Sequence, residues 1–156
     1  MRTYMPKPRE VEEKWWLVDA DRQIVGRLAA RIAKVLLGKT RPTFAPHVKN
    51  GDFVVVVNAG KVALSGKKLT DKVYYSHTGW PGGVKATTPE KLLAEKPEEV
   101  LRKAVWGMMP KTRLGRQLMK RLRIFSGPEH DHAAQQPQPL PVAPRRTRIQ
   151  SAPEEN

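Results

Sequence analysis

Residues 53–58 are the most constraining stretch of the sequence: Phe53-Val54-Val55-Val56-Val57-Asn58 is an apolar, mostly β-branched run. A strand that faces solvent on one side alternates apolar and polar residues, and this run does not alternate. It therefore predicts a strand buried on both faces, as in a parallel sheet covered by helices. Neighbouring parallel strands need a crossover connection, which is usually a helix.

A second strand and such a helix precede this run. Trp15-Trp16-Leu17-Val18-Asp19 is a short strand candidate, and a polar turn leads from it into a helix expected over residues 24–37. Gly38 stands where a helix C-cap belongs. Strand, helix and strand make a βαβ unit, so the predicted fold class is α/β. Residues 62–64 and 73–75 are weaker strand candidates.

The second half of the chain is predicted to be helical. Thr88 and Pro89 are a typical N-cap and first helical residue, and they open a helix that ends near Glu95. A second helix is expected over residues 98–109 and a third over residues 113–122. The apolar residues expected to face the core are Leu101, Val105 and Met108 in the second helix and Leu114, Leu118 and Leu122 in the third.

The chain of 156 residues predicts one domain with two extensions. Residues 1–14 mix charge and proline and predict a flexible N-terminal extension. Residues 15–132 are the expected α/β domain. Gln and Pro dominate residues 133–156, which predicts a disordered tail with a basic cluster at Arg145, Arg146 and Arg148. No signal core and no apolar run of the roughly 20 residues that span a bilayer is present, so we expect a cytoplasmic protein.

Charge is the strongest compositional signal. The chain has 29 Lys and Arg against 15 Asp and Glu, a net charge of +14. Such an excess favours a polyanionic partner over a small-molecule substrate, with nucleic acid ahead of a membrane surface. Between Arg102 and Arg123 eight basic residues occur without an acidic one, which predicts phosphate contact. Arg27, Arg31 and Lys34 share one helix side, where RNA contact and a solvated basic face are equally good interpretations.

An aromatic loop, Tyr74-Tyr75-Ser76-His77-Thr78-Gly79-Trp80-Pro81-Gly82-Gly83, adds a second nucleic-acid signal. Aromatic rings held on a polar loop can stack on bases. Because neighbours along a strand point to opposite faces, we expect one of Tyr74 and Tyr75 in the core and the other at the surface. Trp80 and His77 are the better candidates for RNA contact, although packing on the domain itself is an equal alternative.

Signals for catalysis are weak. Gly38-Lys39-Thr40 and Gly66-Lys67-Lys68 lack the first glycine of a phosphate-binding loop, since Ala33 and Lys61 stand there. The chain has no cysteine, and His130 and His132 without further ligands are a poor metal site. We therefore expect no enzyme activity, no cofactor and no metal.

Several motifs, in order along residues 15–136, resemble the bacterial large-subunit ribosomal protein L-thirteen family. They are Trp16-Leu17-Val18-Asp19-Ala20, Gly26-Arg27-Leu28-Ala29, Pro42-Thr43-Phe44-Ala45-Pro46-His47, Gly51-Asp52-Phe53-Val54-Val55-Val56-Val57-Asn58-Ala59, Ser65-Gly66-Lys67-Lys68, the aromatic loop, Gly107-Met108-Met109-Pro110-Lys111, Leu114-Gly115-Arg116 and Glu129-His130-Asp131-His132-Ala133-Ala134-Gln135. The chain departs from the family at Asp131, where proline is common, and in its two extensions.

The resemblance implies a three-layer α/β/α fold around a small, mostly parallel four-stranded sheet. It also implies a non-enzymatic constituent of the large ribosomal subunit that binds the large (23S-type) rRNA and supports early assembly beside neighbouring ribosomal proteins. An RNA-binding or nucleic-acid architectural protein outside the ribosome is the alternative. The expected RNA contacts are Arg27, Arg31, Lys34, Lys39, Arg41, His47, Lys49, Lys61, Lys67, Lys68, Tyr75, His77, Trp80, Lys85, Lys111, Arg113, Arg116, Lys120, Arg121, Arg123, His130 and His132.

Overall fold

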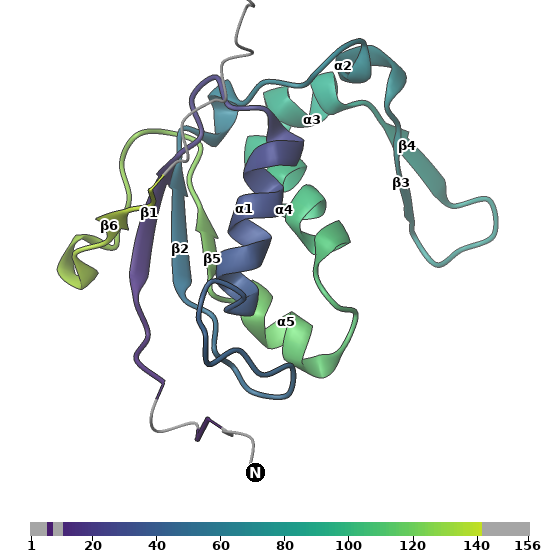
Figure 1. The fold of residues 1–156 in the computed structure, drawn as a ribbon. Coiled ribbons are helices and arrows are strands. Elements are labelled where there is room, and N and C mark those ends of the chain that lie inside the picture. Colours follow the sequence, from purple (N-terminus) through teal and green to yellow (C-terminus); the bar gives the residue numbers. More distant parts are fainter. Residues whose placement is uncertain (1–5, 8–10, 142–156) are drawn as a thin grey trace, which may run out of the picture.

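The computed structural model describes residues 6–7 and 11–141, which fold around a four-stranded parallel sheet (Figure 1). Its strands are β1 (Trp15–Asp19), β2 (Phe53–Val57), β5 (Leu122–Ile124) and β6 (Gln138–Pro139), in the order β5-β2-β1-β6. Trp15 of β1 is in register with Phe53 of β2, and Leu122 of β5 with Val54. The predicted α/β class and the parallel sheet are confirmed.

Four helices lie on one side of this sheet: α1 (Val25–Leu37), α3 (Pro89–Glu95), α4 (Pro97–Met108) and α5 (Arg113–Met119). Because side chains alternate along a strand, Val54 and Val56 of β2 point toward these helices together with Val18 of β1. They join Ile32 and Leu36 of α1 in the hydrophobic core. As expected, α1 ends at Gly38, which adopts a left-handed conformation (φ 77°).

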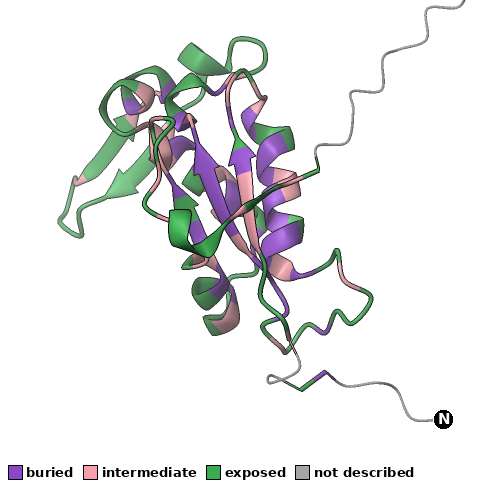
Figure 2. Cartoon of the chain, turned by 90° about the vertical axis from the view of Figure 1, so that its left-hand side faces the viewer, coloured by how far each residue is buried: buried purple, intermediate pink, exposed green. Residues whose placement is uncertain are grey.

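The opposite face of the sheet is covered by the segment that follows β5 and by a short 3-10 turn, η3 (Ala133–Gln135) (Figure 2). Trp15 and Phe53 stack there with ring centroids 4.3 Å apart. The His132 ring lies 5.2 Å from that of Trp15 and 5.9 Å from that of Phe125. Helices therefore form the layer on one face of the sheet, and a loop held by aromatic contacts forms the layer on the other face.

The first part of the C-terminal tail belongs to the sheet. Gln138 and Pro139 form β6, which pairs in parallel with β1, and the N–H of Leu140 donates to the carbonyl of Leu17 (2.9 Å). The prediction of disorder from Ala133 onward is wrong for residues 133–141. Proline lacks an amide donor but is tolerated in an edge strand such as β6. Residues 142–156, with the basic cluster of the tail, lie outside the described residues.

The N-terminal extension also touches the domain. The N–H of Lys14 donates to a carboxylate oxygen of Asp52 (3.2 Å), and the Glu13 carboxylate pairs with Arg121. Glu13 and Lys14 are thus not part of a free segment, contrary to the expectation for residues 1–14. The domain boundary at residue 15 stays a prediction, since residues 1–5 and 8–10 lie outside the described part.

Two predicted helix ends are wrong. α4 ends at Met108, whose side chain is 44% exposed, and the extended backbone of Met109 turns the next side chain into the core instead. α5 ends at Met119, and Leu122 is buried as the first residue of β5 rather than as the last turn of a helix. Leu122 follows Leu118 by four residues, which is the spacing of a helix. It lies in a strand because the edge of β2 is open to pair with it.

Two weaker strand candidates have different outcomes. Residues 62–64 form no strand, and a single bridge joins Ala63 to Ile24. Residues 73–75 lead into β3 (Tyr74–His77), which pairs with β4 (Val84–Thr87) in an antiparallel hairpin outside the main sheet. Figure 1 shows this hairpin projecting from the body of the domain, beyond the short helix α2 (Lys68–Asp71).

Candidate nucleic-acid interface

Most of the predicted RNA contacts are exposed cations and rings, and they gather in two separate parts of the molecule. Figure 1 shows α5 at the lower end of the helical layer and the β3–β4 hairpin projecting from the upper part of the domain. We call the first group the α5 cluster; it consists of Lys39, His47, Lys49, Lys111, Arg113, Arg116 and Lys120. The second group is the hairpin cluster; it consists of Lys67, Lys68, Tyr75, His77, Trp80 and Lys85.

The α5 cluster combines the start of a helix with a neighbouring loop. The Thr112 hydroxyl caps α5 by accepting from the N–H of Gly115 (3.2 Å), which fixes where the helix begins. A Cβ at Gly115 would lie 2.0 Å from the Pro110 carbonyl oxygen, so this tight turn requires glycine. The loop after α1 reaches the same place, because Lys39 shares a groove with Leu114, and His47 and Lys49 share another with Gln117.

No acidic residue occurs between Met109 and Pro128, so the cations of α5 lack acidic neighbours in sequence. Arg113, Arg116 and Lys120 are all exposed. Lys111 lies 4.0 Å above the ring of Trp106 and donates to its carbonyl oxygen. The like-charged run is shorter than the sequence indicated, because Arg102 pairs with Glu98 and Glu99 on the preceding turn of α4 (3.7 and 3.5 Å).

The hairpin cluster presents two aromatic rings. Tyr75 is 72% exposed and Trp80 is 76% exposed. The tip is shaped by turns in which the N–H of Gly83 donates to the Trp80 carbonyl (2.9 Å) and His77 Nδ1 accepts from the N–H of Gly79 (2.9 Å). Gly79 has a φ of 94°, which side-chain-bearing residues rarely adopt. The turns therefore hold Trp80 outside the core, where its ring is accessible.

Tyr74 and Tyr75 divide between inside and outside, as predicted. Tyr74 packs against the hydrophobic core, and the ammonium groups of Lys72 and Lys103 lie 4.8 and 5.1 Å from its ring centroid. Tyr75 points to the other face of the hairpin, in register with Ala86. Tyr74 therefore anchors the hairpin while Tyr75 remains accessible.

Five predicted contacts lie between the clusters or beside them. Arg27 and Lys34 are exposed on α1, and Arg31 is half-buried between them. Lys61 is exposed after β2, and Arg123 is exposed on β5. These cations extend the positive surface beyond the two clusters.

Four predicted RNA contacts, which stay predictions, also make contacts within the domain. Arg41 pairs with the buried carboxylate of Asp52, and Arg121 pairs with Glu13 and donates to the Gly51 carbonyl. The guanidinium of Arg121 also lies 5.0 Å from the Phe53 ring centroid. His130 and His132 pack on Phe125. We assign all four to the stability of the domain, and the sequence could not show this because most of their partners are distant along the chain.

Asp19, at the end of β1, has a lowered pKa. The Asn58 side chain donates to its carboxylate (2.9 Å), the N–H of Asp21 donates as well (3.0 Å), and Lys61 adds a smaller attraction. These contacts favour the charged carboxylate and tie the turn after β1 to the end of β2.

Replacing Asp19 with Asn should therefore reduce stability in a pH-dependent way. A lowered pKa stabilises the fold above the unfolded pKa and loses this effect as the pH falls through the folded pKa. We expect a loss of at most about 1 kcal/mol at pH 7, as for other exposed ionic contacts. The difference from wild type should shrink below about pH 4. Urea unfolding at pH 7 and pH 3 measures it, and an equal loss at both values would contradict the assignment.

Among the described residues, no group of three or more His, Cys, Asp or Glu side chains is placed to hold a metal ion. None of the helices in the described part of the chain is long and apolar enough to cross a bilayer. The fold and the surface together define a small, strongly basic α/β protein with cations and exposed rings in two separate parts.

The comparisons with known proteins identify the family. The family model described as ribosomal protein L13 matches residues 13–131, and the chain belongs to this family. The large ribosomal subunit protein uL13 of Symbiobacterium thermophilum is 56% identical over 141 residues, which are 90% of this chain and 99% of that protein. The uL13 protein of Chlorobaculum parvum is 57% identical over 141 residues, 90% of this chain and 94% of that protein. That of Geobacter sp. strain M21 is 56% identical over 142 residues, 91% of this chain and all of that protein.

Proposed function

We propose that this protein is a structural constituent of the large ribosomal subunit that binds the large rRNA and acts in the cytoplasm as part of the ribosome. Membership of the ribosomal protein L13 family carries the proposal. It also confirms the expectation that the protein is not an enzyme. Family membership favours the ribosome over an RNA-binding role outside it.

The distribution of charge supports a specific mode of binding. Cations without acidic neighbours neutralise phosphates and release counterions, which supplies affinity without reading sequence. The α5 cluster and the hairpin cluster lie in separate parts of the molecule, so one copy can contact two rRNA segments at once (Figure 1). Holding two segments lowers the cost of bringing them together, which is the step we assign to subunit assembly.

The two clusters differ in the contacts they offer. The α5 cluster presents guanidinium and ammonium groups, which suit phosphate oxygens. The hairpin adds the exposed rings of Tyr75 and Trp80, which can stack on unpaired bases. We propose that the first cluster positions the protein on the RNA backbone and that the hairpin contacts an irregular RNA segment. Neighbouring ribosomal proteins are the further partners in this account.

Sedimentation of tagged protein from cells tests the proposal. We expect the protein to sediment with large subunits and to stay with them through a high-salt wash. Recovery in free fractions alone, before any wash, would favour the alternative outside the ribosome. A tagged variant with Tyr75 and Trp80 both replaced by Ser should still enter subunits but be released at lower salt.

A further inference from the structure

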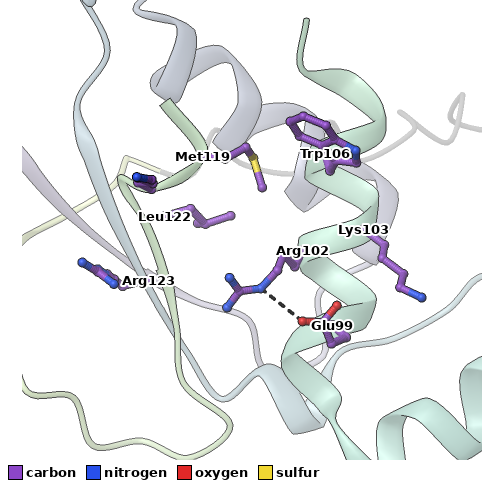
Figure 3. Close-up of a pocket in the computed structure, with 8 residues that line it drawn as sticks. Glu99, Arg102, Lys103, Trp106, Met119, Leu122 and Arg123 are labelled. Atoms are coloured by element: carbon purple, nitrogen blue, oxygen red, sulfur yellow. Dashed lines mark ion pairs between the residues drawn. The ribbon is translucent and has the colours of Figure 1, made fainter. Parts of the chain in front are cut away.

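A groove of about 480 Å³ lies between α4, the end of α5 and β5 (Figure 3). We propose that it binds an unpaired nucleotide of RNA, with the base on its apolar wall and the neighbouring phosphates on its cations. This inference rests on the proposed function, since the RNA in question is the rRNA that the protein binds. Volumes of about 300–1,000 Å³ are usual for small-ligand pockets, so a single base and its sugar fit.

One wall of the groove is apolar. Trp106, Met119 and Leu122 line the groove, and Figure 3 shows the Trp106 and Met119 side chains at its upper end. One face of the Trp106 ring carries the ammonium of Lys111. A surface that contacts only phosphates gains nothing from a recess lined by an indole and a thioether, whereas bases bind by stacking on aromatic and apolar groups.

The residues around this wall are mostly basic. Arg102, Lys103, Lys120 and Arg123 line the same groove, and Glu99 is its single acidic residue. Glu99 pairs with Arg102 (3.5 Å), as the dashed line in Figure 3 shows. The pair holds the Arg102 side chain at the groove, where a guanidinium plane can lie against a base. Lys120 and Arg123 line the groove beside it, and phosphates next to a bound base would meet them. The Lys103 side chain points away from Arg102 in Figure 3, and its ammonium lies 5.1 Å from the Tyr74 ring centroid.

The groove lies at an edge of the sheet. β5 is an edge strand of the sheet, and no described strand pairs with its outer side, so the groove is open to a ligand. An open edge can also receive a strand of another protein. Four cations line the groove, and although Glu98 and Glu99 pair with Arg102, the remaining positive charge favours a polyanion. We therefore commit to RNA.

Replacing Met119 with Arg tests the proposal, because a groove that binds a base and a groove that binds only phosphates predict opposite changes in RNA affinity. Arg adds a cation, which would strengthen a pure phosphate site, but it also fills the recess, which would block a base. Gln117→Arg is the matched control, since it adds the same charge to an exposed position of α5 outside the groove. Both changes are made in full-length protein with Tyr75 and Trp80 replaced by Ser, so that the hairpin does not contribute.

The probes are a short oligoriboadenylate and an abasic ribose-phosphate chain with the same number of phosphates. With the unmodified groove we expect the oligoriboadenylate to bind about tenfold more tightly than the abasic chain. Met119→Arg should remove this preference, and Gln117→Arg should keep it. Equal binding of the two probes to the unmodified groove, or a preserved preference in Met119→Arg, overturns the proposal.

Trp106 provides a second test that does not depend on how well Met119→Arg folds. Trp106→Leu should lose the preference for the base-bearing strand, and Trp106→Phe should keep most of it because a ring remains. Equal behaviour of the two variants overturns the role of Trp106 in the groove. Failure of the wild-type chain to bind rRNA would overturn the proposed function, whereas rRNA binding without any base preference would overturn the groove alone.

Discussion

Replacing Arg113, Arg116 and Lys120 together with Ala is expected to weaken rRNA binding at least about tenfold near physiological salt. The three side chains are exposed on or beside α5, and no acidic residue occurs nearby in the sequence. Each phosphate contact contributes about 0.7–0.9 to the slope of log affinity against log salt concentration. The variant should therefore have a slope lower by about two units, measured by filter binding across a salt series.

The control variant removes the same charge elsewhere. Lys14, Lys91 and Lys96 are exposed and belong to neither cluster. Their replacement by Ala lowers the net charge equally, and we expect it to change the slope by much less. Equal losses in the two variants would mean that net charge alone drives binding and that α5 has no special place in it. Arg121 is left out of the test because it is bound to Glu13 and Gly51 inside the domain.

Replacing Asp52 with Ala is expected to cost about 3–5 kcal/mol in free energy of unfolding, the usual loss when one partner of a buried ion pair is removed. Asp52 is 3% exposed, and its carboxylate binds three groups from two parts of the chain. Its carboxylate pairs with Arg41 and accepts from Trp16 Nε1 (3.0 Å) and the N–H of Lys14 (3.2 Å). The change would leave the Arg41 charge without its carboxylate and the Trp16 donor without a partner, although Arg41 also donates to the Glu12 carbonyl. Urea unfolding followed by circular dichroism measures the loss.

Asp52→Asn is the informative control for this prediction. The amide oxygen can still accept from Trp16 or Lys14, but the charge opposite Arg41 is gone. We expect an intermediate loss of stability. A loss below about 1 kcal/mol for Asp52→Ala would place this ion pair among exposed ones and contradict its role as an anchor. Arg41→Ala should likewise lower stability while leaving the salt dependence of rRNA binding nearly unchanged.

The sequence was enough to predict the central βαβ unit, because local patterns determine it. The unbroken apolar run of β2 predicts a strand buried on both faces, and the helical spacing of apolar residues in α1 predicts a helix with one face in the core. Neither prediction depends on other parts of the chain. The short strands could not be predicted in the same way. β5 contains Arg123 between two apolar residues, and β6 contains a proline and a glutamine. β5 forms a strand because it pairs with the edge of β2, and β6 because it pairs with the edge of β1. This pairing depends on tertiary structure and not on local sequence.

The same distinction applies to the surface. Exposure of Arg113 and Arg116 follows from helical spacing, whereas for Trp80 the sequence left exposure and packing on the domain as equal alternatives. The internal contacts of Arg41 and Arg121 depend on acidic partners elsewhere in the chain; Glu13 is 108 residues from Arg121. The sequence did not predict that Trp106 and Met119 line a groove, because apolar residues in a basic run have the spacing of core residues. Their position beside a charged groove depends on how α4, α5 and β5 pack.

The proposal that this protein joins two parts of the rRNA is best tested by a structure of the assembled large subunit that contains it. We expect side-chain nitrogens of Arg113, Arg116 and Lys120 to lie within hydrogen-bonding distance of rRNA phosphate oxygens. We also expect the β3–β4 hairpin to contact a different rRNA segment from the one at α5. If α5 faced solvent or another protein, or if both clusters met the same RNA segment, the proposal that this protein joins two parts of the rRNA would be wrong.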